Sequence, residues 1–396
     1  MQATELTRDK YPVYAIFINK LFKKKEYMSK KAESVILHKK TLLLGIHAPY
    51  NRIPNIEAYY EEFLHLVRTL DVEYDDVMYM KLRELDRAFF ITRGKLQELT
   101  QYCQDNNIEQ LIISEPLTAQ QERNLEDMVE VDIIDRTKII LDIFEQAAYS
   151  AESKIQVEIA QLQYEKSRLA GKGIFLEQQR GVIGLRSGAG ETLKERETRV
   201  IEKRISALKE KLKSVEKTRD TQRKRRLNAQ VPHVCLIGYT NAGKSSLLNS
   251  LTKSDVLAEN KLFATLDTTT RSLYVNSKQV GIISDTVGFI QLLPPHLIEA
   301  FKSTLKELQY ADLLLHVIDV SDPLWQAHAN VVNKILHELK IDKPILYVFN
   351  KIDKVELTPE LEQEISSFDP HVTSSTISPG GLNQLKAYLG SWEKPD

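Results

Sequence analysis

The segment Gly238-Tyr239-Thr240-Asn241-Ala242-Gly243-Lys244-Ser245 constrains this 396-residue chain more than any other feature. It follows the apolar run HVCLIG and precedes SLLNSLT, which has helical spacing. Glycines at these positions let backbone N–H groups close around an oxyanion, and the helix that follows directs its positive end to the same point. The order of strand, loop and helix predicts a phosphate-binding loop and an α/β domain with a mostly parallel sheet.

Three residues at the end of this loop carry its chemistry. We expect Lys244 to reach the β and γ phosphates of a nucleotide, and the Ser245 hydroxyl to bind Mg²⁺. Ser246, the next residue, completes the predicted phosphate site.

A second motif, Asp285-Thr286-Val287-Gly288, follows the strand-like run VGIIS. An aspartate at this position can hold magnesium through water, and the Gly288 N–H can sense the γ phosphate. Between the two motifs lies a polar, threonine-rich segment from Leu262 to Arg271, where a magnesium-sensing loop belongs. We expect one of its threonines to complete the metal shell in the triphosphate state.

A third motif selects the base. Asn350-Lys351-Ile352-Asp353 follows the strand-like run PILYVF. The Asp353 carboxylate only accepts hydrogen bonds, so it can pair with N1–H and N2–H of guanine, whereas adenine offers no such pair of donors. This favours GTP over ATP. Near the C-terminus, Ser375-Thr376-Ile377 follows HVTS and is expected to support the guanine with a backbone N–H.

The residue after the second motif bears on hydrolysis. Many GTPases have a glutamine there to orient the attacking water, whereas this chain has Phe289. A phenyl ring can neither donate nor accept the required hydrogen bond. We therefore predict slow intrinsic hydrolysis that rises when a partner orders the flanking loops or supplies a polar group.

Upstream of the nucleotide motifs, short apolar runs alternate with helical patterns, which predicts a second, small parallel sheet with crossover helices. The expected strands are 41–48, 76–80, 109–114 and 131–135, and the expected helices are 56–70, 94–106, 118–128 and 136–149. We assign residues 1–149 to this domain, with residues 1–40 as a lysine-rich extension of uncertain structure.

Residues 150–228 have a different pattern. Apolar residues recur at heptad-like spacings on two segments, at Ile155, Ile159, Leu162 and Leu169, and at Ile201, Ile205, Leu208, Leu212 and Val215. Six of the 15 glycines fall in residues 171–190. We predict an antiparallel helical hairpin with a glycine-rich tip, followed by a nucleotide-binding domain over residues 229–396. Because the apolar seam can be satisfied within one chain, we expect a monomer.

The second helix of this hairpin is strongly basic. From Lys194 to Arg226 there are fourteen Lys or Arg against six Asp or Glu, although the whole chain has a net charge of -1. Such a helix is often only a solvated surface. The excess of one sign also suits a polyanion such as RNA.

Composition excludes several classes of protein. The chain is 42% hydrophobic, its apolar runs are too short to span a bilayer, and it has 2 cysteines, which cannot form a disulfide framework. We therefore expect a cytoplasmic protein with no membrane association.

Five further segments accompany the nucleotide motifs: Gln120–Glu126, Asp135–Phe144, the glycine-rich run Gly181–Glu191, Arg204–Ser206 and the basic run Gln222–Arg226. With these segments, the chain resembles the HflX family of translation-associated GTPases over roughly residues 41–390. The family's loop pattern FATLD stands here as Phe263-Ala264-Thr265-Leu266-Asp267, which singles out Thr265 as the magnesium ligand beside Ser245 and Asp285. Lys244, Thr265 and Gly288 are then the expected catalytic residues.

The chain departs from the family pattern at several places. Thr268 stands where proline is usual, and Thr376 where alanine is usual. A glycine-rich pattern in the N-terminal domain is reduced to Phe90–Lys95, which disfavours a second nucleotide site there.

The resemblance implies binding to the large ribosomal subunit and its RNA through the hairpin and basic helix, with GTP-dependent splitting or rescue of stalled or idle ribosomes. Lys172, Arg180 and Arg186 lie on the hairpin's predicted tip. The alternative is a GTP-controlled interaction protein whose hairpin recruits a protein partner, with hydrolysis as a timer.

Overall fold

The structure is a computed structural model that describes residues 39–51, 55–171, 193–228, 231–252, 262–263, 265–267, 269–276, 278–292 and 302–392. Several predictions fall outside these residues: those on the extension 1–38, on the hairpin tip with Lys172, Arg180 and Arg186, and on Ala264 and Thr268. The side chains of Arg223 to Arg226 also lie outside the described part, although the helix that contains them is described.

The first sheet is fully parallel, with strand order β2-β1-β3-β4. Its strands are β1 (Thr41–His47), β2 (Asp76–Lys81), β3 (Gln110–Ile113) and β4 (Asp132–Ile134). Its helices are α2 (Ile56–Thr69), α3 (Arg93–Asp105), α4 (Ala119–Val129) and α5 (Arg136–Ala147). All eight predicted elements are present within a few residues of their expected ends, because alternating apolar runs and amphipathic helices leave few other ways to bury both faces of a sheet.

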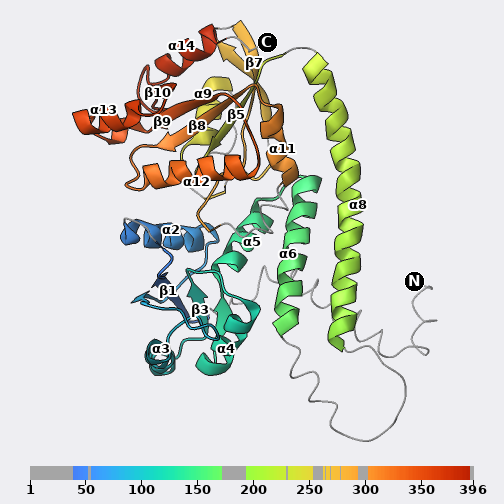
Figure 1. The fold of residues 1–396 in the computed structure, drawn as a ribbon, viewed down its shortest axis with the longest axis vertical. Coiled ribbons are helices and arrows are strands. Elements are labelled where there is room, and N and C mark those ends of the chain that lie inside the picture. Colours follow the sequence, from blue (N-terminus) through green and yellow to red (C-terminus); the bar gives the residue numbers. More distant parts are fainter. Residues whose placement is uncertain are drawn as a thin grey trace, which may run out of the picture. The chain divides into compact units, whose positions relative to one another are not determined.

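Side-chain caps fix where these helices begin. Asn55 accepts a hydrogen bond from the Ala58 N–H at the start of α2. Thr118 and Gln121 form a reciprocal capping box at α4. Each cap satisfies backbone donors that the first helical turn leaves unpaired. Helices α2 and α5 cover one face of the sheet and α3 and α4 the other, each with its own buried cluster (Figure 1).

Two long helices follow, α6 (Ala151–Gly171) and α8 (Leu193–Asn228). They pack side by side through Ile155, Ile159 and Leu208, which are buried (Figure 1). Ion pairs join Glu158 to Arg204 and Lys166 to Glu202. The residue further along α6 pairs with the residue that comes earlier on α8. The two helices are therefore antiparallel, as the apolar seam predicts.

The second sheet has six strands in the order β10-β9-β8-β5-β7-β6, and only the β6–β7 pair is antiparallel. Its elements are β5 (His233–Gly238), α9 (Lys244–Thr252), β6 (Thr270–Val275), β7 (Lys278–Ser284), α11 (Lys302–Tyr310), β8 (Leu313–Asp319), α12 (Trp325–Glu338), β9 (Ile345–Asn350), the 3₁₀ turn η2 (Ile352–Lys354), α13 (Pro359–Ser366), β10 (His371–Thr373) and α14 (Asn383–Ser391).

Helices cover both faces of this sheet. Helices α9 and α14 pack on one face and α11 and α12 on the other, as their buried clusters show. The predicted α/β architecture is therefore confirmed. In the described part of the chain, the helices are too short or too polar to cross a membrane.

Candidate nucleotide site

The predicted phosphate-binding loop connects the end of β5 to the start of α9. Asn241 and Gly243 have positive φ angles of 60° and 92°. A Cβ added at Gly243 would lie 2.4 Å from Nδ2 of Asn350, so this position requires glycine both for its backbone conformation and for its close approach to β9. The loop therefore takes the tight shape that lets backbone N–H groups converge.

Lys244 is buried at the centre of this loop. Its Nζ donates to the carbonyl oxygens of Tyr239 at 2.8 Å and Gly238 at 3.3 Å. Burial lowers the pKa of Lys244 to about 8, while the nearby Asp285 carboxylate opposes that change. The ammonium group is thus poorly solvated and gains from an anionic ligand.

Ser245, Thr265 and Asp285 come together although they lie on three separate segments. The Ser245 hydroxyl oxygen lies 2.8 Å from Oδ2 of Asp285 and 2.9 Å from the Thr265 hydroxyl oxygen. The Thr265 hydroxyl donates to the same Oδ2 at 3.0 Å. Three oxygen atoms of this kind, one of them a carboxylate, match the ligands that Mg²⁺ prefers.

Gly288, three residues after Asp285, lies close to the phosphate-binding loop. A Cβ at Gly288 would lie 2.9 Å from Lys244 Nζ and 3.0 Å from the Thr240 Cα. The next residue, Phe289, exchanges backbone hydrogen bonds with the loop, donating to Gly238 O at 3.1 Å and accepting from Thr240 N at 2.8 Å. The Phe289 side chain is buried in the core with residues of α11 and α12.

Other residues of the second motif have structural partners. The Thr286 hydroxyl donates to Leu236 O at 2.6 Å, and Val287 packs in the same buried cluster as Tyr239. Ser246 lies in the first turn of α9, partly buried.

The base-selecting motif begins where β9 ends. Asn350 donates to Ala242 O at 2.9 Å, and Lys351 donates to Asn241 O at 2.8 Å, so both hold the phosphate-binding loop. Ile352 and Asp353 lie in η2, where Asp353 is exposed. The Asp353 carboxylate is therefore accessible, three residues after Asn350, which is bonded to the phosphate-binding loop.

The last motif forms a turn beside β9. The buried Ser375 hydroxyl accepts from Ile377 N at 3.2 Å and from Ser378 N at 3.0 Å, while the Ile377 side chain is 78% exposed. Thr376 is partly buried between them. Because Ser374 also donates to Asn350 Oδ1 at 3.2 Å, the turn is tied to the base-selecting motif.

The structure adds a residue that the sequence analysis missed. Asp319, at the end of β8, accepts from Lys351 Nζ at 2.5 Å. The sequence contains a signal that could have identified Asp319, because it is an acidic residue at the end of an apolar strand. Strand β8 lies between β5 and β9, so its carboxyl end reaches the same edge of the sheet as theirs.

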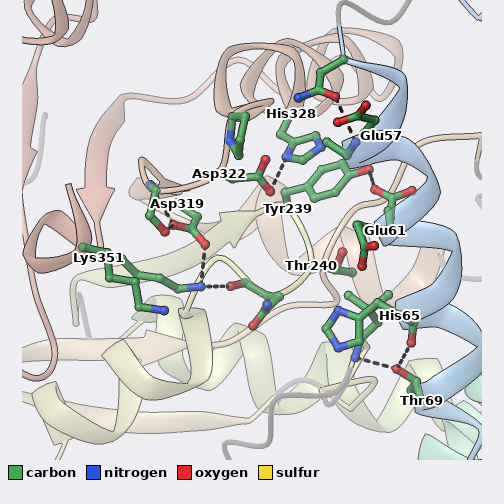
Figure 2. A pocket seen from close by; sticks show the side chains of 18 of the residues that line it. Glu57, Glu61, His65, Thr69, Tyr239, Thr240, Asp319, Asp322, His328 and Lys351 are labelled. Atoms are coloured by element: carbon green, nitrogen blue, oxygen red, sulfur yellow. Dashed lines mark hydrogen bonds and ion pairs between the residues drawn. The ribbon is translucent and has the colours of Figure 1, made fainter.

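A cavity of about 820 Å³ lies between the phosphate-binding loop and helix α2. Figure 2 shows Glu57, Glu61 and His65 of α2 on one side, with Asp319 and Lys351 on another. The cavity is thus lined by residues that lie nearly 300 positions apart in the sequence. Sequence motifs gave no indication of the α2 wall.

Tyr239 joins the loop to this wall. Its ring stacks on His328 with centroids 3.7 Å apart (Figure 2), and its phenol donates to Glu62 Oε2. The phenol also accepts from Gln291 N at 2.8 Å. Burial, followed by the Glu62 charge, raises the pKa of Tyr239 well above its ordinary value, so the phenol keeps its proton.

Glu62 also binds Arg136 at the start of α5. The Arg136 side chain is fully buried and pairs with Glu62 Oε1, and its Nη2 donates to Gln291 O at 3.4 Å. A chain of contacts therefore runs from helices α5 and α2 through Glu62 and Tyr239 to Gln291, in the segment that follows Gly288.

The remaining residues of the FATLD segment face other elements. Phe263 and Leu266 are buried with residues of α2 and α5, and the Phe263 ring contacts Phe144 edge-on at a centroid distance of 4.6 Å. The Asp267 carboxylate accepts hydrogen bonds from Ser150 at the start of α6.

In the described residues, no group of three or more His, Cys, Asp or Glu side chains could hold a metal ion. The cluster of Ser245, Thr265 and Asp285 is therefore the candidate magnesium site.

Three family models match successive parts of the chain. They are described as GTP-binding GTPase N-terminal over residues 57–145, GTP-binding GTPase Middle Region over residues 147–226, and 50S ribosome-binding GTPase over residues 233–351.

Individual relatives agree with these models. GTPase HflX of Caldanaerobacter subterraneus subsp. tengcongensis is 47% identical over 307 residues, which are 77% of this chain and 72% of that protein. GTPase HflX of Escherichia coli K12 is 41% identical over 82% of this chain and 76% of its own length. The crystal structure of SsGBP with GDP is 26% identical, covers 89% of this chain and 97% of its own, and has a TM-score of 0.50. The chain therefore belongs to the HflX family of GTPases, whose nucleotide-binding domain is that of the 50S ribosome-binding GTPases.

Proposed function

We propose that this protein binds GTP with Mg²⁺, hydrolyses it slowly on its own, and acts on the large ribosomal subunit, where it splits or rescues stalled or idle ribosomes. The observation that carries the nucleotide part is the cluster of Ser245, Thr265 and Asp285 oxygens beside the buried Lys244. Three segments converge there with the oxygen donors that a magnesium–nucleotide complex requires.

Ser245 and Thr265 would hold the metal directly, with Asp285 acting through water. When bound, Mg²⁺ supplies positive charge to the phosphate oxygens. Lys244 adds a second cation, which an anionic phosphate would return to its fully charged form, since burial alone lowers its pKa. The Gly288 N–H would contact the terminal phosphate, a role supported by the closeness of this residue to Lys244 and Thr240.

Asp353 would recognise guanine through N1–H and N2–H. Lys351 would support the nucleotide while held by Asp319 and by Asn241 O. SsGBP, which is similar over 89% of this chain, was solved as a complex with GDP, and this supports a guanine nucleotide as the ligand.

Slow intrinsic hydrolysis follows from the position of Phe289. Its ring packs in the core against α11 and α12, so it neither orients a water molecule nor leaves the position to another side chain. A partner would have to add a polar group or reposition the loops to accelerate the reaction.

Binding to the large ribosomal subunit is supported by the match of residues 233–351 to the 50S ribosome-binding GTPases. We assign the contact to the helical pair, whose α8 has the excess of basic residues, and to its tip.

We divide the chain into three domains, residues 1–149, 150–228 and 229–396. We propose that the protein acts as a monomer and binds Mg²⁺ with GTP or GDP. The alternative is recruitment of a protein partner by the α6–α8 pair.

The test measures GTP hydrolysis by the full chain alone and with purified 50S or 30S subunits. We expect a low basal rate, at least a tenfold increase with 50S subunits and little change with 30S subunits, with Lys244→Ala as the inactive control. Fast hydrolysis without ribosomes contradicts the role given to Phe289.

Sedimentation separates the two candidate functions. With a non-hydrolysable GTP analogue, the protein should sediment with 50S subunits, and rising salt should release it steeply because counterions return to the RNA. Replacement of Arg223 to Arg226 by glutamine should reduce binding. If no protein sediments with 50S subunits at low salt, recruitment of a protein partner is favoured instead.

A further inference from the structure

Asp267 connects the GTP-sensing segment to the helical pair. Its Oδ2 accepts from the backbone N–H groups of Tyr149 at 3.1 Å and Ser150 at 2.9 Å. Its Oδ1 accepts from the hydroxyl of Ser150 at 2.5 Å and also from that of Ser153. Four donors from one short stretch, more than 110 residues away in sequence, therefore converge on a single carboxylate.

The stretch that supplies these donors is the start of α6. The Ser150 hydroxyl also accepts from Ser153 N at 3.0 Å, and Ser150 O accepts from Lys154 N at 3.1 Å, so Ser150 caps this 21-residue helix. A carboxylate at the positive end of a long helix is electrostatically favourable. Asp267 thus extends the cap of α6 with a side chain from the nucleotide-binding domain.

The segment on the other side of Thr265 is held as well. Leu262 N donates to the Thr69 hydroxyl at 3.2 Å, and the Phe263 ring is buried against Phe144. Thr265 therefore lies between two anchors, one on α2 and α5 and one on α6. Its hydroxyl reaches Asp285 and Ser245 from this fixed position.

We propose that Asp267 is a positioning residue: by binding the first turn of α6 it holds Thr265 at the magnesium–GTP site, and so couples that site to the helical pair. This inference rests on the proposed role of Thr265. Coupling is reciprocal, so a ligand that fixes Thr265 also strengthens the hold on α6, and a partner that moves α6 weakens the binding of GTP. The device would let engagement of the helical pair be sensed at the nucleotide.

Nucleotide affinity tests this proposal in the full chain. Dissociation constants are measured by fluorescence for mant-labelled GDP and for a mant-labelled non-hydrolysable GTP analogue, both with excess Mg²⁺. For Asp267→Asn and Asp267→Ala we expect the GTP analogue to bind about tenfold more weakly, as the loss of charged hydrogen bonds suggests. Affinity for GDP should stay within about twofold, because Thr265 is needed only in the triphosphate state.

Ser153→Ala removes one of the four donors to Asp267 from the α6 side and leaves the nucleotide site unaltered. It should also weaken the binding of the GTP analogue. The double variant Asp267→Ala with Ser153→Ala should bind the analogue as well as Asp267→Ala alone does. Glu158→Gln is the matched control, since it loosens the pair of helices at Arg204 but leaves the Asp267 contact intact. We expect it to bind both nucleotides as the unaltered protein does.

Thr265→Ala distinguishes a failure of the role proposed for Asp267 from a failure of the proposed magnesium site. If Thr265→Ala weakens the GTP analogue selectively and Asp267→Ala does not, the positioning role of Asp267 is overturned while the proposed site stands. If Thr265→Ala has no selective effect, the proposed magnesium site itself fails. Additive effects of Asp267→Ala and Ser153→Ala would also overturn the coupling.

Discussion

The phenol of Tyr239, in the phosphate-binding loop, donates a hydrogen bond to the carboxylate of Glu62 on α2. The same phenol accepts from Gln291 N, and Glu62 holds the buried Arg136. The Tyr239 side chain thereby links helix α2 to the segment after Gly288. Both segments that we propose to contact the γ phosphate and its metal are thus anchored outside the nucleotide-binding domain, one through Tyr239 and the other through Asp267.

Removal of the Tyr239 hydroxyl tests the first of these links. Tyr239→Phe leaves Gln291 N and one Glu62 oxygen without this partner, so we expect a loss of about 2 kcal/mol in the free energy of unfolding. The Gln291 amide should also exchange hydrogen faster. Urea unfolding and hydrogen exchange measure these effects, and Tyr149→Phe is the control, since Tyr149 is 73% exposed. Equal stability of Tyr239→Phe and the unaltered protein would show that the link contributes nothing.

Arg136 is a buried charge, and its removal would leave the Glu62 carboxylate without its ion-pair partner. Arg136→Met leaves Glu62 charged and poorly compensated, so the free energy of unfolding should fall by about 3 to 5 kcal/mol. Combining it with Glu62→Gln should recover part of this loss, because no lone charge then remains. Arg68→Met is the matched control, because Arg68 is exposed and its ion pair with Glu61 spans 4.0 Å. We expect that control to change stability by less than about 0.5 kcal/mol.

Gly243 should tolerate no side chain. In Gly243→Ala the new Cβ meets Asn350 Nδ2 at 2.4 Å, in a backbone conformation that alanine rarely adopts. Affinity for GTP should fall at least about tenfold, as measured by titration with a fluorescent nucleotide, because Asn350 must leave Ala242 O. Gly94→Ala has open space in α3 and should instead stabilise the protein by about 0.5 to 1 kcal/mol. Normal GTP affinity in Gly243→Ala would contradict the loop geometry.

Asp353 should determine the choice of base. Asp353→Asn replaces one acceptor oxygen with a donor N–H, which faces the N–H groups of guanine and should weaken GTP by at least about tenfold. Xanthine has an oxygen in place of the 2-amino group, so XTP should bind this variant better than GTP does. Competition between the two nucleotides measures the preference. Unchanged preference for GTP would remove Asp353 from the base site, and Asp342→Asn provides a control away from the motifs.

His316 should make the fold sensitive to acid. Burial lowers the pKa of His316 to about 3, with the Lys244 charge adding to this effect. The unfolded chain takes up this proton near pH 6.5 and the folded chain does not, so stability falls as pH drops from about 6.5 toward 3, by at most about 1.4 kcal/mol per pH unit. Chemical unfolding at several pH values should show a shallower slope for His316→Gln. His337→Gln, on an exposed part of α12, should keep the original slope.

The sequence by itself determined most of the secondary structure and which segments form the candidate nucleotide site. Glycine spacing, strand-then-loop order and acceptor-only Asp353 are local features, and each has one dominant chemical use. The apolar seams of α6 and α8 likewise predicted an antiparallel pair, because two amphipathic helices that follow each other in the sequence can bury their apolar stripes against each other.

Only the tertiary structure decided which side chains support that site. Three such contacts join residues of the candidate site to Glu62, Asp319 and the α6 cap, which lie up to 177 positions away in the sequence. Arg136 acts one step further out, because it pairs with Glu62. Nothing in the local pattern of a helix such as α2 distinguishes a glutamate facing solvent from one facing Tyr239. Such contacts depend on how packed elements orient their faces toward one another, which is set by the burial of the whole core rather than by any short segment.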